Sequence, residues 1–252
     1  MGEPGAELGA RMRVSGWVLL AAMLALPWRG AAAEPARLLL TTEEDPPYNF
    51  TDPITGRITG IAGELVPLIM ERAGIAYDVQ MLPWRRAYEM AQRQANTCVF
   101  AINVTRERLP LFEWVGPVAH GGWTLFGRPD WNRSVTDLAT LGDVTVVVQS
   151  GSGIEAHLVE RGVAVVPVTA MGAMMPMLAN RRADLVAIGA ANGPWLARQA
   201  GIELKPVLRM TDTDLSVACN PGLDKGLLAR MRAALKALRD EGTVERLNGA
   251  YR

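Results

Sequence analysis

Residues 76–102 read AYDVQMLPWRRAYEMAQRQANTCVFAI, and the order of polar and apolar residues in this stretch decides the fold. Residues 76–81 and 98–102 have the length and composition of strands, and residues 83–94 have those of an amphipathic helix. Pro83 begins this predicted helix, and proline suits the first turn of a helix, where its missing N–H leaves no hydrogen bond unmade. Strands joined through a helix pair in parallel by a right-handed crossover. The stretch therefore predicts a β–α–β unit.

The same alternation continues upstream of this unit. Residues 38–41 are predicted to form a strand, and residues 63–73 a helix that contains Pro67 and ends at Gly74. Downstream, Gly116-Pro117 and Gly121-Gly122 are predicted to break the chain before a short strand at residues 123–126. The first half of the chain is thus a β–α–β–α–β unit with a parallel sheet.

A second α/β unit follows a polar stretch at residues 130–143. Its predicted strands are 144–148, 163–168 and 185–188, its helices are 154–161, 170–181 and 194–200, and the chain then continues with extended segments at 205–210 and 215–219 and a helix at 223–240. Two such units predict an α/β protein of two lobes, each a mostly parallel sheet flanked by helices. Such folds bind ligands in the cleft at the C-terminal ends of their strands.

The N-terminus has the pattern of a secretory signal peptide. Arg11 and Arg13 precede the apolar run VLLAAMLAL at residues 18–26, and three alanines at 31–33 form a small-residue cleavage site. The apolar run is shorter than the roughly 20 residues that a membrane-spanning helix needs. We expect residues 1–33 to be removed and the mature protein to reside in the periplasm, whether translation starts at Met1 or at Met12.

Composition excludes several classes of function. The chain has 26 basic and 26 acidic residues, so no surplus of positive charge points to nucleic acid. His120 and His157 are the only histidines and lie far apart, so no metal site is expected. Four methionines lie close together at 171, 174, 175 and 177, and their helical spacing indicates an apolar packing face more than a copper site. We expect no cofactor.

Six motifs, in this order, resemble one family of proteins. They are EEDPPYNF (43–50), GIAGEL (60–65), LPWRRAYEMA (82–91), INVTRERLPLFEWVGP (102–117), VVVQSGSG (146–153) and NRRADLVAIG (180–189). Together they resemble the family 3 periplasmic solute-binding proteins, the polar amino-acid receptors of ABC transporters. The resemblance covers the chain from about residue 34 to its end and implies a type II periplasmic-binding-protein fold.

The resemblance also implies an organisation and a function. Lobe 1 would contain residues 34–125 and 213–252, and lobe 2 residues 126–212, with hinges near Leu125 and Thr213 that close on the ligand. The protein would be a monomer without catalytic activity that captures a small polar ligand bearing a carboxylate and delivers it to an ABC transporter permease. Two alternatives stay open: a dehydratase on the same fold, and a soluble ligand-sensing subunit of a membrane receptor.

Three residues are the main candidates for ligand binding. Arg108 ends a Thr-x-x-Arg stretch that begins at Thr105, where the family holds a carboxylate-binding arginine, and a guanidinium matches a carboxylate in bidentate geometry. Asn103 is similar to a polar residue whose backbone meets the ligand. Ser152 is similar to a residue that reaches the carboxylate beside the N–H groups of a helix start, and it could equally be a simple helix cap.

Four further residues are expected near the cleft: Trp84, Glu44, Tyr48 and Arg85. Trp84 lies close to where relatives stack an aromatic ring on the ligand. One departure from the family concerns Gly189, which stands where relatives place the aspartate that binds the ligand's α-ammonium group. Either Glu44 replaces this aspartate, or the ligand is not a standard α-amino acid. The dehydratases of this fold also need an acid there, and the chain has none.

Cys98 and Cys219 leave two possibilities open. An exported protein can form disulfides, and two cysteines can form one. Each of them also lies in an apolar run that could bury a free thiol. The resemblance places both on neighbouring strands of lobe 1, which makes a disulfide geometrically possible.

Overall fold

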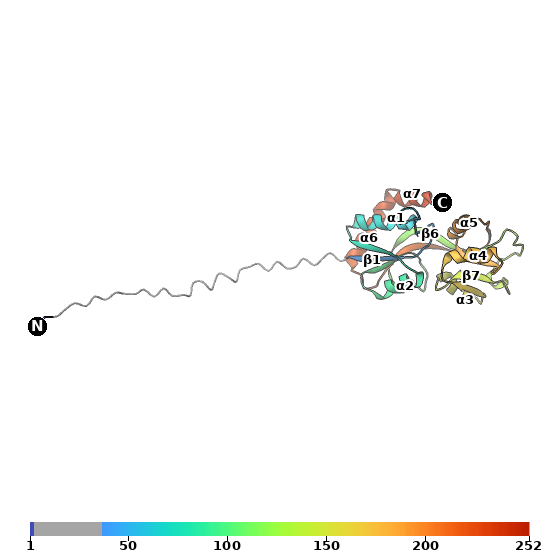
Figure 1. The fold of residues 1–252 in the computed structure, drawn as a ribbon, viewed down its shortest axis with the longest axis horizontal. Coiled ribbons are helices and arrows are strands. Elements are labelled where there is room, and N and C mark those ends of the chain that lie inside the picture. The colour runs from blue at the N-terminus through green and yellow to red at the C-terminus, as the bar shows by residue number, and fades with distance from the viewer. Residues whose placement is uncertain (3–36, 252) are drawn as a thin grey trace. The chain divides into compact units, whose positions relative to one another are not determined.

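The computed structural model, which describes residues 1–2 and 37–251, contains an eight-stranded sheet in the order β4-β1-β5-β10-β6-β9-β7-β8 (Figure 1). Its strands are β1 (Leu38–Thr42), β4 (Tyr77–Met81), β5 (Thr97–Asn103), β6 (Glu113–Gly127), β7 (Val146–Gln149), β8 (Val165–Val168), β9 (Leu185–Gly189) and β10 (Lys205–Cys219). A separate two-stranded ribbon consists of β2 (Phe50–Thr51) and β3 (Ile58–Thr59). The predicted signal peptide at residues 1–33 lies outside the described residues, apart from Met1 and Gly2.

One half of the sheet forms lobe 1. Its strand β1 lies between β4 and β5 and is parallel to both, which confirms the predicted β–α–β–α–β unit. The helices α1 (Ile61–Ala73), α6 (Lys225–Asp240) and α7 (Thr243–Ala250) share one apolar cluster with this sheet, and α2 (Trp84–Arg93) packs on β5 and β10 in another. Helix α1 continues through Pro67 and ends at Gly74, which adopts the left-handed conformation typical of a helix terminus.

The other half of the sheet forms lobe 2, where β7 lies parallel to both β8 and β9. Helix α3 (Gly153–Val159) shares one apolar cluster with β7, while α4 (Met174–Ala179) and α5 (Asn192–Ala200) belong to another with β9. Met174 and Met175 are buried in this second cluster, and Met171 and Met177 pack against it, as expected for an apolar packing face. No helix in the described part of the chain is long and apolar enough to cross a membrane.

The long antiparallel strands β6 and β10 belong to both lobes (Figure 1). The prediction that Gly116-Pro117 and Gly121-Gly122 break the chain was therefore wrong, because β6 runs through both pairs. Gly116 serves close strand packing instead, since a Cβ there would lie 2.0 Å from Ser216 Oγ of β10. The two extended segments predicted at 205–210 and 215–219 are likewise parts of the single strand β10.

The apolar clusters suggest where one lobe gives way to the other. Residues of β6 up to Ala119 and of β10 from Leu215 belong to the lobe 1 cluster. Leu125 of β6, and Val207, Leu208 and Met210 of β10, belong to a lobe 2 cluster or pack against it. The hinges predicted near Leu125 and Thr213 stay a prediction, because they concern movement of one lobe against the other.

Cys98 and Cys219 form a disulfide. They stand directly opposite each other in the antiparallel pair of β5 and β10, with their Cα atoms 3.9 Å apart. Both are fully buried in the lobe 1 core. Of the two possibilities that the sequence left open, the structure shows the bridge, and it ties the returning strand β10 to the centre of the lobe 1 sheet.

Candidate functional site

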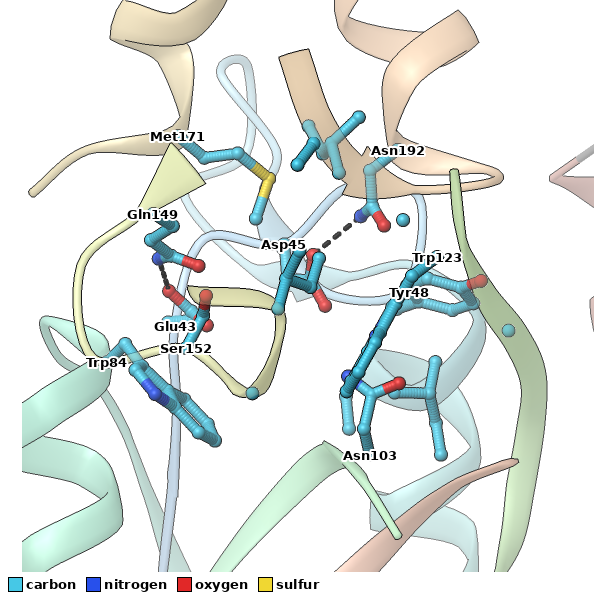
Figure 2. Close-up of a pocket in the computed structure, with 18 of the residues that line it drawn as sticks. Glu43, Asp45, Tyr48, Trp84, Asn103, Trp123, Gln149, Ser152, Met171 and Asn192 are labelled. Carbon is cyan, nitrogen blue, oxygen red and sulfur yellow. Dashed lines mark hydrogen bonds between the residues drawn. The ribbon is translucent and has the colours of Figure 1, made fainter. Parts of the chain in front are cut away.

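A cavity lies between the two lobes, at the C-terminal ends of β1 and β5 on one side and of β7 and β9 on the other (Figure 2). Parallel strands end at the same edge of a sheet, so the loops that follow them meet at this place. The cavity measures about 50 Å³. Because a buried water needs roughly 10–15 Å³ on this measure, the cavity suits a small solute.

Five of the residues predicted from the sequence line this cavity. They are Arg108, Ser152, Asn103, Trp84 and Tyr48. The structure does not place Glu44 or Arg85 there. Glu44 is exposed, and its carboxylate accepts hydrogen bonds from the backbone N–H of Thr51, at 3.1 and 3.2 Å, and from the Thr51 hydroxyl. Arg85 is also exposed, and its guanidinium lies beside Gly151 of the opposite lobe, outside this cavity. Neither residue contributes to the cavity wall.

Arg108 is buried, with only 8% of its surface exposed. Its guanidinium carbon lies 5.2 Å from the ring centre of Trp84 and 5.3 Å from that of Tyr88, so both aromatic faces can stabilise its charge. Its Nη1 donates one hydrogen bond, of 3.3 Å, to the backbone oxygen of Asn103. Within residues 37–251 it makes no ion pair with a carboxylate. Burial lowers the pKa of Arg108, although an arginine stays charged in proteins.

Three other predicted residues that line the cavity make hydrogen bonds to neighbouring segments. Trp84 Nε1 donates to the backbone oxygen of Gly151 at 2.9 Å, which links α2 to the loop before α3 in the opposite lobe. The Ser152 hydroxyl accepts a hydrogen bond of 3.1 Å from the N–H of Glu155, so Ser152 is the cap of α3 as well as a wall residue. Asn103 Oδ1 accepts a hydrogen bond of 2.8 Å from the hydroxyl of Thr213.

Tyr48 closes the cavity on the lobe 1 side. Its hydroxyl donates to the backbone oxygen of His120 at 3.1 Å, and its ring is almost fully buried. Burial raises the pKa of the Tyr48 phenol, so this hydroxyl stays protonated and acts as a donor at neutral pH.

Sequence reasoning missed two carboxyl groups, those of Glu43 and Asp45, which line the cavity on either side of the exposed Glu44. These residues continue β1 in an extended segment, where successive side chains point to opposite sides. This alternation is the signal that could have found them, because it groups Glu43 with Asp45 and sets Glu44 apart.

Each of these carboxyl groups is paired with an amide from lobe 2, as Figure 2 shows. Gln149 Nε2, at the end of β7, donates to Glu43 Oε2. Asn192 Nδ2, at the start of α5, donates to Asp45 Oδ1 at 2.5 Å and to the backbone oxygen of Pro46 at 2.8 Å. Two acid–amide pairs therefore connect the lobes across the cavity.

The cavity favours the protonated form of both acids. Burial raises the pKa of Glu43 well above its usual value, and the nearby charge of Asp45 raises it further. Burial raises the pKa of Asp45 to about 7, against the opposing effect of the hydrogen bond from Asn192.

The lobe 2 wall carries no charge. Its lining residues between positions 149 and 192 are Gln149, Ser152, Gly153, Ile154, Met171, Met174, Ala187, Ile188, Gly189 and Asn192. Gly189 is the last residue of β9 and has no side chain that could act as an acid. In the described part of the chain, no group of three or more His, Cys, Asp or Glu residues could hold a metal ion.

Residues 38–251 match the family model of the bacterial extracellular solute-binding proteins, family 3. The chain belongs to this family. The match covers nearly all of the described residues and confirms the resemblance found in the six sequence motifs. No curated protein matches the chain significantly.

Solved structures of similar proteins include members with several functions. A histidine kinase sensor domain is 22% identical, with a TM-score of 0.78 over 85% of this chain and 95% of that one. An ancestral arginine-binding protein bound to arginine is 22% identical, with a TM-score of 0.76 over 86% of this chain and 98% of that one. An ancestral amino acid-binding protein, a precursor of cyclohexadienyl dehydratase, is 21% identical, with a TM-score of 0.74 over 86% of this chain and 95% of that one. These similarities establish the type II periplasmic-binding-protein fold.

Proposed function

We propose that this protein captures a small polar ligand bearing a carboxylate in the cavity between its lobes, and that Arg108 is the anchor of that carboxylate. The observation that carries this proposal is the buried guanidinium of Arg108, which lines the cavity and makes no ion pair within residues 37–251. A buried charge is costly unless it is paired, so an anionic group of the ligand is the natural partner. The planar guanidinium fits a carboxylate with two parallel hydrogen bonds.

The captured ligand would be delivered to the permease of an ABC transporter. Family membership supports this role, because the family consists of extracellular solute-binding proteins. We propose that the mature protein acts in the periplasm as a monomer, after removal of residues 1–33. If genes for a permease and an ATPase lie beside this gene, they support transport. If a kinase gene lies there and no permease or ATPase gene does, transport is contradicted.

The test is a thermal-shift screen of amino acids, amines and small carboxylates, combined with native mass spectrometry of freshly purified protein to detect a bound ligand. We expect carboxylate-bearing compounds to raise the melting temperature, because a ligand that binds only the folded state stabilises it. Compounds without a carboxylate that bind equally to wild type and to Arg108→Ala would contradict the role of Arg108.

Ligand sensing is a second candidate function. The similarity to a histidine kinase sensor domain favours it, and sensing needs the same closure around a ligand as transport does. The two functions differ in the partner of the closed form. Ligand-dependent binding to a membrane kinase, with none to a permease, would favour sensing.

Catalysis is the less favoured alternative. The similarity to a precursor of cyclohexadienyl dehydratase is one observation in favour of catalysis. A second is that lobe 1 provides two carboxyl groups with raised pKa that could donate a proton. We propose that the protein is not an enzyme, because lobe 2 provides no acid on its side of the cavity. Formation of product from prephenate or arogenate, lost in Asp45→Asn, would overturn this view.

A further inference from the structure

A second and larger hollow lies beside the cavity, and we call it the outer groove. It measures about 410 Å³. Its walls come from segment 104–111 in lobe 1, from segment 151–161 in lobe 2, and from residues 211–213 of β10. Ala156, on the lobe 2 wall, is exposed, so the groove opens to solvent.

The outer groove meets the cavity at Arg108. Both spaces are lined by Arg108, Trp123, Ser152 and Gly153. A Cβ on Gly153 would lie 3.1 Å from Cζ2 of Trp123 and 3.5 Å from Nη2 of Arg108, so the loop before α3 closely approaches both side chains. A ligand whose carboxylate is held by Arg108 can therefore extend into the groove as well as into the cavity.

Three rings line the outer groove, and each comes from a different element. Tyr88 belongs to α2, His157 to α3, and Trp123 to β6. The ring centres of Trp123 and His157 lie 5.5 Å apart at 72°, and the Tyr88 ring centre lies 5.3 Å from the guanidinium carbon of Arg108. Burial lowers the pKa of His157, so its ring is uncharged at neutral pH. Aromatic rings prefer edge-to-face or offset-stacked neighbours, and this groove offers such neighbours beside the arginine.

Apart from Arg108, the charged residues of the groove are paired or exposed. Asp212 accepts a hydrogen bond of 2.9 Å from Nε of Arg209. Arg161 lies 3.9 Å from the carboxylate of Glu160, and Glu107 is exposed. Exposed charges attract a partner only weakly, so the groove favours an uncharged group of the ligand.

Two buried polar atoms in the wall of the groove have no hydrogen-bond partner within residues 37–251. They are Nε1 of Trp123 and Oγ1 of Thr211. The two residues stand opposite each other in the antiparallel pair of β6 and β10, and Trp123 is only 5% exposed. An indole N–H can only donate, and a buried donor without an acceptor is costly. An oxygen or nitrogen acceptor of a ligand in the groove would remove this cost.

We propose that the outer groove is a second subsite, which binds an aromatic ring of the ligand, and that an acceptor atom on this ring hydrogen-bonds to Trp123 and Thr211. The inference rests on the proposed function, because Arg108 holds the carboxylate of the same ligand where the groove meets the cavity. The ligand class is therefore small aromatic carboxylates in which a short linker joins ring and carboxylate.

The experiment compares matched carboxylates by calorimetry. Phenylalanine and 3-phenylpropanoate extend alanine and propanoate by a phenyl ring, and tyrosine adds an oxygen. We expect at least one phenyl compound to bind about tenfold or more tightly than its matched aliphatic compound, because burial of a ring this size favours binding by at least that factor. Tyrosine should bind more tightly than phenylalanine, and cyclohexylalanine, which has no flat aromatic face, more weakly. If the ring adds nothing, or if cyclohexylalanine binds as tightly as phenylalanine, the inference is wrong.

Three variants test the place of the ring. Ala156 lines the groove and not the cavity, so Ala156→Phe should abolish the gain from the ring and leave the affinity for alanine and propanoate unchanged. His157→Ala removes one of the three rings and should reduce the gain severalfold. Thr211→Val should remove the advantage of tyrosine over phenylalanine. Val159→Phe is the matched control, because Val159 is exposed on the same helix but lies outside the groove.

The outcomes separate this inference from the role of Arg108. If Arg108→Ala weakens binding of alanine and propanoate, while the gain from the ring survives Ala156→Phe, the carboxylate anchor is upheld and the ring subsite is overturned. If phenyl compounds bind equally to Arg108→Ala and to wild type but lose affinity in Ala156→Phe, the ring subsite is upheld and the anchor is overturned. If no compound of the set binds, the inference is wrong, because these compounds represent its ligand class.

Discussion

The side-chain amide of Asn192 occupies the space that a side chain at position 189 would need. A Cβ on Gly189 would lie 1.8 Å from Asn192 Oδ1 and 2.9 Å from its Cγ. The amide nitrogen of Asn192 donates to Asp45 and to Pro46 in the opposite lobe. Gly189 is therefore the residue that lets a neutral amide reach across the cavity from this point of lobe 2.

This relationship predicts a specific effect of Gly189→Ala. The new methyl group must displace the Asn192 amide. Residues 189 and 192 both belong to lobe 2 and are only three positions apart, so this clash does not depend on whether the lobes are open or closed. Overpacking of this kind typically costs about 1–3 kcal/mol of unfolding free energy. In an Asn192→Ala background the same substitution should cost clearly less, because the amide is gone. Equal costs in both backgrounds, measured by urea denaturation, would show that the two positions do not interact.

The disulfide between Cys98 and Cys219 should contribute strongly to stability. It joins residues 121 positions apart, and the chain-entropy model gives about 4–5 kcal/mol for a loop of this length, often less in practice. The double variant Cys98→Ala/Cys219→Ala should therefore melt at a clearly lower temperature than the oxidised protein. The control is alkylation of the denatured, unreduced protein, which should modify neither cysteine. Modification of both would mean that the bridge does not form.

The raised pKa of Asp45 makes stability depend on pH. In the unfolded chain an aspartate titrates near pH 4, and in the folded protein burial raises the pKa of Asp45 to about 7. The folded state thus holds a proton that the unfolded state has lost, and stability from this group falls as pH rises from about 4 through 7. The variant Asp45→Asn has no titrating group at this position, so its stability should not fall with rising pH on account of residue 45.

Asp45→Asn should accordingly gain stability relative to wild type as pH rises from 5 to 8, by an amount on the order of 2 kcal/mol. The measurement is urea denaturation of ligand-free protein at both pH values. Glu44→Gln serves as the control, because this carboxyl group is exposed. A difference between Asp45→Asn and wild type that stays constant with pH would show that Asp45 titrates normally.

Processing of the N-terminus is a further prediction. The apolar run at residues 18–26 followed by alanines at 31–33 predicts cleavage after Ala33, so that Glu34 becomes the first residue of the mature chain. N-terminal sequencing of protein isolated from the periplasm tests this. A mature chain that retains residues 18–26 would contradict both the signal peptide and the proposed location.

Local patterns in the sequence predicted the parallel core of each lobe. The strands β1, β4 and β5 lie within one or two residues of their predicted ranges, because short apolar runs between amphipathic helices leave little choice of structure. The long strands β6 and β10 were missed as continuous elements. The glycines and the proline of β6 look like breaks when read locally, and the role of Gly116 in close strand packing depends on Ser216, which lies 100 residues away in the chain. In β10 the polar residues 211–214 separated the two predicted segments.

The candidate site was predicted in part for a similar reason. Arg108 and Asn103 follow directly from the position of β5, so a motif and one strand suffice to place them. Glu44 was predicted in place of Glu43 and Asp45, because the direction in which each side chain points after β1 was not considered. The hydrogen bonds of these two acids with Gln149 and Asn192 form only where the two lobes meet, so no single segment of sequence predicts them. Contacts between distant segments of this kind leave no local pattern in the sequence.

Arg108 is the residue on which the proposed function depends most. It is buried beside the rings of Trp84 and Tyr88, it lines the cavity, and its Nη1 donates one hydrogen bond to the backbone oxygen of Asn103. Removing one partner of a buried charged pair typically costs about 2–5 kcal/mol of binding free energy, so Arg108→Ala should weaken binding of a carboxylate ligand at least about thirtyfold.

Arg108→Lys should also weaken this binding, because an ammonium group cannot reproduce the two parallel hydrogen bonds of a guanidinium. Arg106→Ala is the matched control: Arg106 is exposed two residues away, and exposed charges contribute less than about 1 kcal/mol. Calorimetry with a ligand from the screen measures all three variants, and circular dichroism checks that each is folded. Equal affinity of wild type and folded Arg108→Ala would mean that no carboxylate binds at this arginine, and the proposal of a carboxylate-bearing ligand would then have to be abandoned.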